Sequence, residues 1–112
     1  MKQVDLRELQ AAHKEWSERN FPPSDQPSGR ALFGLMEELG ELAHAHLKQA
    51  QGIRCNEDHG ANGRDAVGDI VIFLADYCTQ RGWSLEECIT ETWAEVSSRD
   101  WVRYPDTGRP ST

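Results

Sequence analysis

AVGDIVIFLADYC, residues 66–78, is the most apolar segment of the chain and decides its fold. Apolar side chains cover most of its circumference when it is drawn as a helix, so we expect a helix that is surrounded on several sides. The β-branched run Ile70-Val71-Ile72 would also suit a buried strand. Because the apolar stretch is long and the sequence offers no partner strand, we favour the helix.

Three further segments have the apolar spacing of helices. The four expected helices cover about residues 4–19, 30–51, 64–81 and 85–100. Gly82 is well placed to end the third helix, and Ser84-Leu85-Glu86-Glu87 matches a capping box at the start of the fourth. The apolar stripe of the fourth helix consists of Leu85, Ile89, Trp93 and Val96. Prolines and glycines predict loops over Asn20–Gly29 and Gly52–Gly63.

These elements predict an all-α fold, a four-helix bundle. We expect one helical domain over residues 1–104 and a flexible tail over residues 105–112. Charged residues make up 28% of the chain and the mean hydropathy is -0.71, so one chain has a modest apolar supply. A homo-oligomer, either a dimer or a tetramer, would complete the core.

Charge and cysteine content exclude several classes of function. The formal net charge of -7 argues against a nucleic-acid polymer or an anionic membrane as partner, since both require clustered basic residues. A small phosphorylated ligand is compatible with this charge when a divalent cation accompanies it. The three cysteines form no paired spacing, and no signal peptide or long uncharged stretch is present, so we expect a cytoplasmic protein without disulfides.

Two acidic clusters carry most of the functional information: Glu37-Glu38-Leu39-Gly40-Glu41 and Asp65-Ala66-Val67-Gly68-Asp69. Helix positions three or four apart share a face, so Glu38 lies with Glu41 and Asp65 lies with Asp69. A single Glu-rich turn is most often a solvated helix face, but both clusters lie in apolar surroundings. Carboxylates resist such burial unless a positive charge lies between them. Oxygen ligands from two facing helices predict a hard-cation site for Mg²⁺, with Mn²⁺ as the alternative.

The two clusters together resemble the MazG-type all-α NTP pyrophosphohydrolases. That family shares an EExxE motif on one helix and an ExxD motif on the next, separated by a variable loop. Here Glu37–Leu42 and Asp65–Leu74 resemble the two motifs, and the resemblance covers about Ala31–Trp101. It implies the all-α NTP pyrophosphatase fold. It also implies hydrolysis of a nucleoside triphosphate, (d)NTP, between the α and β phosphates to (d)NMP and pyrophosphate.

One position departs from the family pattern. The ExxD motif would place a glutamate three residues before Asp69, where this chain has Ala66, and Asp65 stands one residue earlier. Two interpretations stay open. Asp65, rotated by about 100° around the helix, reaches the cation directly or through water. Alternatively, one ligand is missing and metal affinity or rate has fallen.

The resemblance and the chemistry of phosphoryl transfer assign roles to the carboxylates. We expect Glu38, Glu41 and Asp69 to be the principal metal ligands, with Asp65 supplementary. Glu37 is either a further ligand or the base that orients the attacking water. Glu37 and Glu38 are therefore the candidate catalytic residues.

Four residues are candidates for substrate binding. Lys48 follows Glu41 by seven positions and can meet a phosphate, although a lysine there also complements the helix dipole. Arg64 and Arg99 are further candidates for phosphate contacts. Trp16 is a candidate for base stacking, although its place on an apolar stripe is more typical of a core residue.

Other metal sites fit the sequence less well. Glu41 and His44 form an ExxH pair as in di-iron bundles, but a second pair is absent because Ile72 occupies its place. Cys55 and His59 supply only two of the four ligands that a structural zinc site needs.

A non-catalytic function also stays open. The Ala66 departure is compatible with a helical dimerisation or regulatory module that retains a degenerate metal site. Pyrophosphate release from nucleotides in the presence of Mg²⁺ distinguishes this alternative from the enzyme.

Overall fold

The structure is a computed structural model and describes residues 3–22 and 27–111. It contains four helices, α1 (Leu6–Asn20), α2 (Arg30–Gln51), α3 (His59–Arg81) and α4 (Leu85–Ser97). The described residues include no strand, so the all-α prediction is confirmed and the run Ile70-Val71-Ile72 belongs to α3. Residues 23–26, in the middle of the expected Asn20–Gly29 loop, lie outside the described part. No described helix has both the length and the apolar composition needed to cross a membrane.

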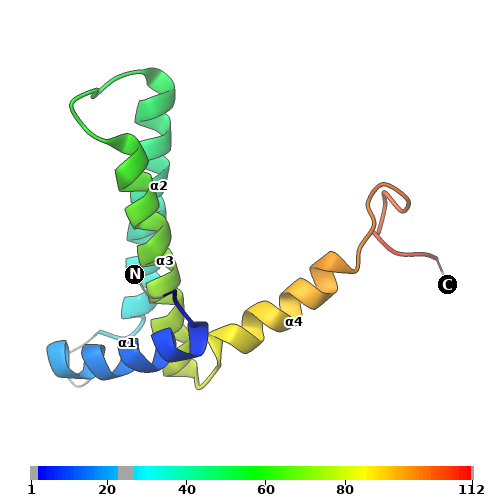
Figure 1. Cartoon of the computed structure of the whole chain (residues 1–112), viewed down its shortest axis with the longest axis horizontal. Helices are drawn as coiled ribbons and strands as arrows, with labels where there is room; N and C mark the ends of the chain where they lie inside the picture. Colours follow the sequence, from blue (N-terminus) through cyan, green and yellow to red (C-terminus); the bar gives the residue numbers. More distant parts are fainter. Residues whose placement is uncertain (1–2, 23–26, 112) are drawn as a thin grey trace.

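The scaffold of the fold is a hairpin of α2 and α3, which run side by side in opposite directions (Figure 1). Small buried side chains occur on both helices, Ala31 and Ala45 on α2 and Ala66 on α3. α2 covers the predicted range and ends at Gly52, whose φ of 67° is the left-handed conformation that favours glycine.

The start of α3 differs from the prediction. We expected a loop as far as Gly63, but the helix begins at His59. Asp58 caps it, because its Oδ1 accepts the N–H of Ala61 at 3.0 Å. The His59 Nε2 lies 3.0 Å from the carbonyl oxygen of Ile53, which ties the first turn to the loop. The cap and this contact outweigh the low helix propensity of the glycines that follow.

α1 crosses one end of the hairpin (Figure 1). The Gln10 amide fixes this crossing: its nitrogen donates to the Trp83 carbonyl at 2.8 Å, and its oxygen accepts the Leu85 N–H at 2.9 Å. Beneath the crossing lies a small core of Ala75, Cys78 and Leu85. α1 is therefore anchored to the turn between α3 and α4.

α4 does not close a four-helix bundle within one chain. Ser84 caps it as predicted, with its Oγ accepting the Glu87 N–H at 3.3 Å. The first residue, Leu85, is buried, but the helix then points away from the hairpin (Figure 1). The rest of its predicted apolar stripe, Ile89, Trp93 and Val96, is exposed. The prediction of four helices is thus confirmed for the described residues. The NTP pyrophosphatase type of the fold and its completion by homo-oligomerisation stay predictions.

The segment after α4 folds back on itself. α4 ends at Ser97, three residues earlier than expected, and the Asp100 N–H donates to the Gly108 carbonyl at 2.8 Å. Gly108 has a φ of 77° and is buried against Arg99. Residues 100–109 therefore form a closed turn, which includes the first part of the segment 105–112 that is predicted to be a flexible tail.

Candidate functional site

Three carboxylates meet on α2. Glu37, Glu38 and Glu41 each offer an oxygen, and the three oxygens lie within 4.8 Å of one another. The helical period explains this, because Glu41 lies three positions after Glu38 and four after Glu37, and such pairs share one side of a helix. In the described part of the chain, no other group of three or more His, Cys, Asp or Glu residues could hold a metal ion.

Glu38 is the centre of this cluster. Its Oε2 is buried and has no hydrogen-bond partner. Desolvation by burial is the main cause that raises its pKa from 4.5 to about 7, and a hydrogen bond to Glu41 and the charges of Glu41, Asp69 and Glu37 raise it further. The ion pairs among the described residues involve none of these four carboxylates. Within residues 3–22 and 27–111, no cationic side chain therefore forms an ion pair with these carboxylates.

The two aspartates of α3 extend the cluster in different directions. Asp69 is close enough to raise the pKa of Glu38, and it also lines a pocket next to α1. Asp65 lines a second hollow of about 410 Å³, together with Glu37 and Glu41. Ala66, where the family motif has a glutamate, is buried. Asp65, which directly precedes Ala66, thus lies beside the carboxylates of α2.

The donors fit a hard divalent cation. The cluster offers carboxylate oxygens alone, which Mg²⁺ and Mn²⁺ prefer to nitrogen and sulfur. The orphaned Oε2 of Glu38 is a buried acceptor that a cation would satisfy. Burial, and after it the charges of the neighbouring carboxylates, raise the pKa of Glu38, and a bound cation would oppose both effects.

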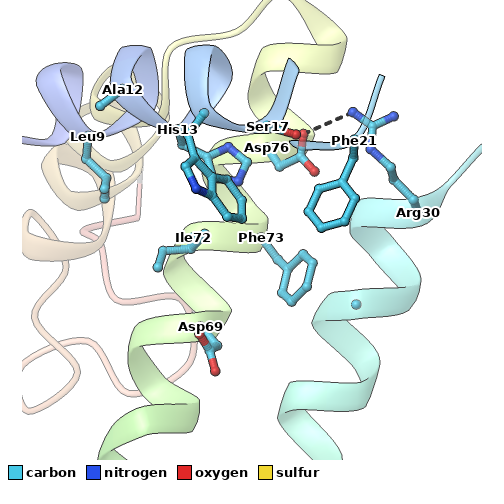
Figure 2. Close-up of a pocket in the computed structure, with 12 residues that line it drawn as sticks. Leu9, Ala12, His13, Ser17, Phe21, Arg30, Asp69, Ile72, Phe73 and Asp76 are labelled. Carbon is cyan, nitrogen blue, oxygen red and sulfur yellow. Dashed lines mark hydrogen bonds and ion pairs between the residues drawn. The ribbon is translucent and has the colours of Figure 1, made fainter. Parts of the chain in front are cut away.

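A pocket of about 690 Å³ lies between α1 and the α2–α3 hairpin (Figure 2). Aromatic rings form much of its wall. The ring centroids of His13 and Trp16 are 5.8 Å apart, and so are those of Trp16 and Phe21. Phe73 of α3 faces the same space, and Asp69 lies on its lining. An aromatic pocket therefore shares one residue with the acidic cluster.

Gly34 makes room for the Phe73 ring. A Cβ at this position would lie 2.3 Å from Cε1 of Phe73 and 2.5 Å from its Cζ. These distances are far below van der Waals contact, so only glycine allows the ring to lie against α2. The position of one pocket wall depends on this residue.

A partly buried ion pair forms the polar end of the pocket. The Arg30 guanidinium lies 3.4 Å from Oδ1 of Asp76 (Figure 2), and the Gln80 amide donates to the same oxygen at 3.0 Å. Asp76 is only 7% exposed. The Nδ1 of His13 is buried without a partner. The pocket thus combines stacking surfaces with polar groups that can hydrogen-bond to a heteroaromatic ring.

Of the four predicted substrate-binding residues, only Trp16 lines this pocket. Lys48 donates to Gln51 at 3.3 Å and lines a separate hollow near the loop after α2. Arg64 is exposed on α3 and lines neither the pocket nor the Asp65 hollow. Arg99 pairs with Glu95 at 2.9 Å beyond the far end of α4. No ion pair between described residues joins these three cations to the carboxylates, and their roles in substrate binding stay predictions.

Sequence reasoning missed several pocket residues. His13 belongs to the apolar stripe of the first helix, and a polar ring on such a stripe is a signal that could have been used. Phe21, Arg30 and Phe73 carry no local signal, because their roles arise only when α1 crosses the hairpin. Asp76 lies on the face of α3 that continues from Asp69.

The alternative metal sites gain no further ligands. The Cys55 thiol contacts the Gly52 carbonyl at 3.4 Å, and no third ligand joins Cys55 and His59 among the described residues. His44 lines the second hollow together with Glu41 and Asp65. The second ExxH pair that a di-iron site needs is still absent, because Ile72 occupies its place.

In comparisons with known protein families, with functionally curated proteins and with solved structures, no match to this chain was found. The acidic cluster and the aromatic pocket are therefore the observations from which its function is inferred.

Proposed function

We propose that this protein is a Mg²⁺-dependent nucleoside triphosphate pyrophosphohydrolase of the MazG-like kind. It would cleave (d)NTP between the α and β phosphates to give (d)NMP and pyrophosphate. The observation that carries the proposal is the juxtaposition of carboxylates that no described cation pairs with and an aromatic pocket that shares Asp69 with them. A nucleotide has the matching parts, a planar base and a polyphosphate that travels with divalent cations.

The carboxylates are the proposed cation ligands. Glu38, Glu41 and Asp69 would hold Mg²⁺, or Mn²⁺ in its place, with support from Asp65 and Glu37. When bound, the cation supplies charge neutralisation for the phosphates and lowers the pKa of water.

The remaining steps belong to the residues of the chain. Trp16, Phe21 and Phe73 offer stacking surfaces for the base and exclude water from one side of the site. Glu37 is exposed and lines the hollow beside Glu41, where its carboxylate can accept a proton from the attacking water. That water adds to the phosphoanhydride while the bond between the α and β phosphates breaks, and pyrophosphate leaves with the bonding electrons.

A second candidate function rests on Ala66. Its buried methyl group stands where a glutamate would add a carboxylate. A non-catalytic dimerisation or regulatory module with a degenerate metal site would tolerate this loss. In either case we propose a homodimer or homotetramer, because one chain leaves much of its apolar surface exposed.

The test is incubation with Mg²⁺ and a panel of NTPs and dNTPs, with pyrophosphate release as readout. Glu38→Gln and Asp69→Asn should abolish release, whereas Glu91→Gln on the exposed face of α4 should leave it unchanged. Turnover of at least one nucleotide with this pattern supports the enzyme. No turnover with any nucleotide, together with no thermal shift on adding Mg²⁺, would overturn it in favour of the module.

A further inference from the structure

α4 and the turn that follows it form an arm, residues 85–109. Its contacts with α1 and α3 are concentrated at its first turn: Leu85 packs in the small core, and Glu86 pairs with Arg7 at 2.7 Å. Beyond that turn the helix extends away from the hairpin (Figure 1). A helix of 13 residues is marginal in water when it stands alone. The arm therefore needs a surface on which to pack.

The exposed area and the radius of gyration of the chain indicate how much surface a second copy could bury. The chain exposes 8738 Å², whereas a compact monomer of its mass exposes about 6,200 Å². Its radius of gyration is 18.1 Å, against about 13 Å for a compact domain of this length. A standard interface buries about 800 Å² on each partner. The excess of about 2,500 Å² per chain is more than enough for a stable dimer.

Two exposed apolar stripes have the same spacing. On the arm, Ile89, Trp93 and Val96 follow one another at intervals of four and three residues, and Trp93 is 64% exposed. On α2, Leu32, Met36 and Leu39 repeat the same intervals, and Met36 is 68% exposed. Each stripe therefore spans about 10 Å of helix. Intervals of four and three are those at which two helices interlock their side chains.

The α2 stripe is also free of the carboxylates of the candidate site. Glu37 and Glu41 are rotated around the axis of α2 by more than about 100° from the centre of the stripe. The residues that border the stripe, Phe33, Gly40, Ala43 and His46, include no acidic group. A helix as acidic as α4 can therefore pack there without facing these carboxylates.

We propose that the arm of one chain docks on α2 of a second copy, with the Ile89–Trp93–Val96 stripe against the Leu32–Met36–Leu39 stripe. Two-fold symmetry then makes the contact twice, since each chain offers one arm and one α2 stripe. The exchanged arms complete the helical bundle that one chain leaves open. The docking does not depend on nucleotide hydrolysis, so a result against one proposal leaves the other unaffected.

Light scattering after size exclusion tests the assembly. The wild-type chain of 12.7 kDa should elute as a dimer, or as a tetramer built from dimers. Trp93→Asp and Met36→Asp should each convert it to monomers, whereas Ala94→Asp, which adds the same charge to another face of α4, should not. A monomeric wild-type protein at tens of micromolar, or dissociation by Ala94→Asp alone, would overturn the proposal. Far-ultraviolet circular dichroism verifies that each variant keeps its helices.

Mixing the two monomeric variants tests the exchange itself. A Met36→Asp chain keeps an intact arm, and a Trp93→Asp chain keeps an intact α2 stripe, so the mixture can rebuild one of the two contacts. Mixed dimers should therefore form from samples that are monomeric when separate. If the mixture stays monomeric, the stripes pair like with like, and docking of the arm on α2 is wrong.

Discussion

Replacing Gly34 by alanine tests the wall of the aromatic pocket. The added Cβ would lie 2.3 Å from the Phe73 ring, so the ring must retreat by at least 1.1 Å to reach ordinary contact at 3.4 Å. Overpacking of this kind costs about 1–3 kcal/mol. Alanine also favours a helix over glycine by about 1 kcal/mol. The net effect of Gly34→Ala is therefore a loss of about 0–2 kcal/mol in the free energy of unfolding.

Gly40 provides the matched control on the same helix. A Cβ there meets nothing within 4 Å, so Gly40→Ala should stabilise the protein by about 1 kcal/mol. Urea unfolding of both variants should give a difference of about 1–3 kcal/mol between them. Gly34→Ala should also raise the KM of any hydrolysed nucleotide, because the displaced ring narrows the pocket. Equal stabilisation by the two substitutions would refute the packing of Phe73 against α2.

Three further predictions concern charge and packing. In the absence of a cation, the pKa of Glu38 is about 7 in the folded state and near 4.5 when unfolded, so the folded state binds more protons between these values. The free energy of unfolding should therefore fall as pH rises from about 4.5 to 7. The affinity for Mg²⁺, measured by calorimetry, should increase over the same range. A stability and an affinity that do not change with pH, or a pH dependence that Glu38→Gln leaves unchanged, would contradict this. Leu85→Ala removes the large buried side chain that anchors α4 and should lower the free energy of unfolding in urea by about 2–5 kcal/mol. The control Leu85→Met should lower it by less than about 1.5 kcal/mol. Equal losses would refute the claim that Leu85 anchors α4. Arg30→Gln leaves the buried Asp76 without its cation and should lower the free energy of unfolding by about 1–3 kcal/mol. Adding Asp76→Asn should restore most of this stability. If it does not, Arg30 stabilises the protein through another contact.

Local patterns were sufficient for most helix boundaries. α2 begins and ends where its apolar spacing and Gly52 predict, and the Ser84 cap begins α4 as expected. The start of α3 was missed because Gly60 and Gly63 are typical of loops. A long-range contact from His59 and a cap from Asp58 decide that region, and neither leaves a periodic signal.

The same distinction applies to the candidate site. The spacing within α2 predicts that Glu38 and Glu41 share one side of a helix, and the structure places their oxygens together with one from Glu37. The separation of Asp65 and Asp69 into two hollows depends on how α1 covers α3, which spacing cannot show. The exposed stripe of α4 could not be foreseen either. Its sequence is that of a buried helix face, and the surface that would bury it lies outside the single chain.

Phosphorus NMR of a nucleoside triphosphate incubated with the protein and Mg²⁺ tests the central claim most directly, because it identifies the bond that is cleaved. The account predicts that monophosphate and pyrophosphate signals grow together, and that Asp69→Asn prevents both. Diphosphate with orthophosphate, or an unchanged triphosphate spectrum across all common bases, would contradict it.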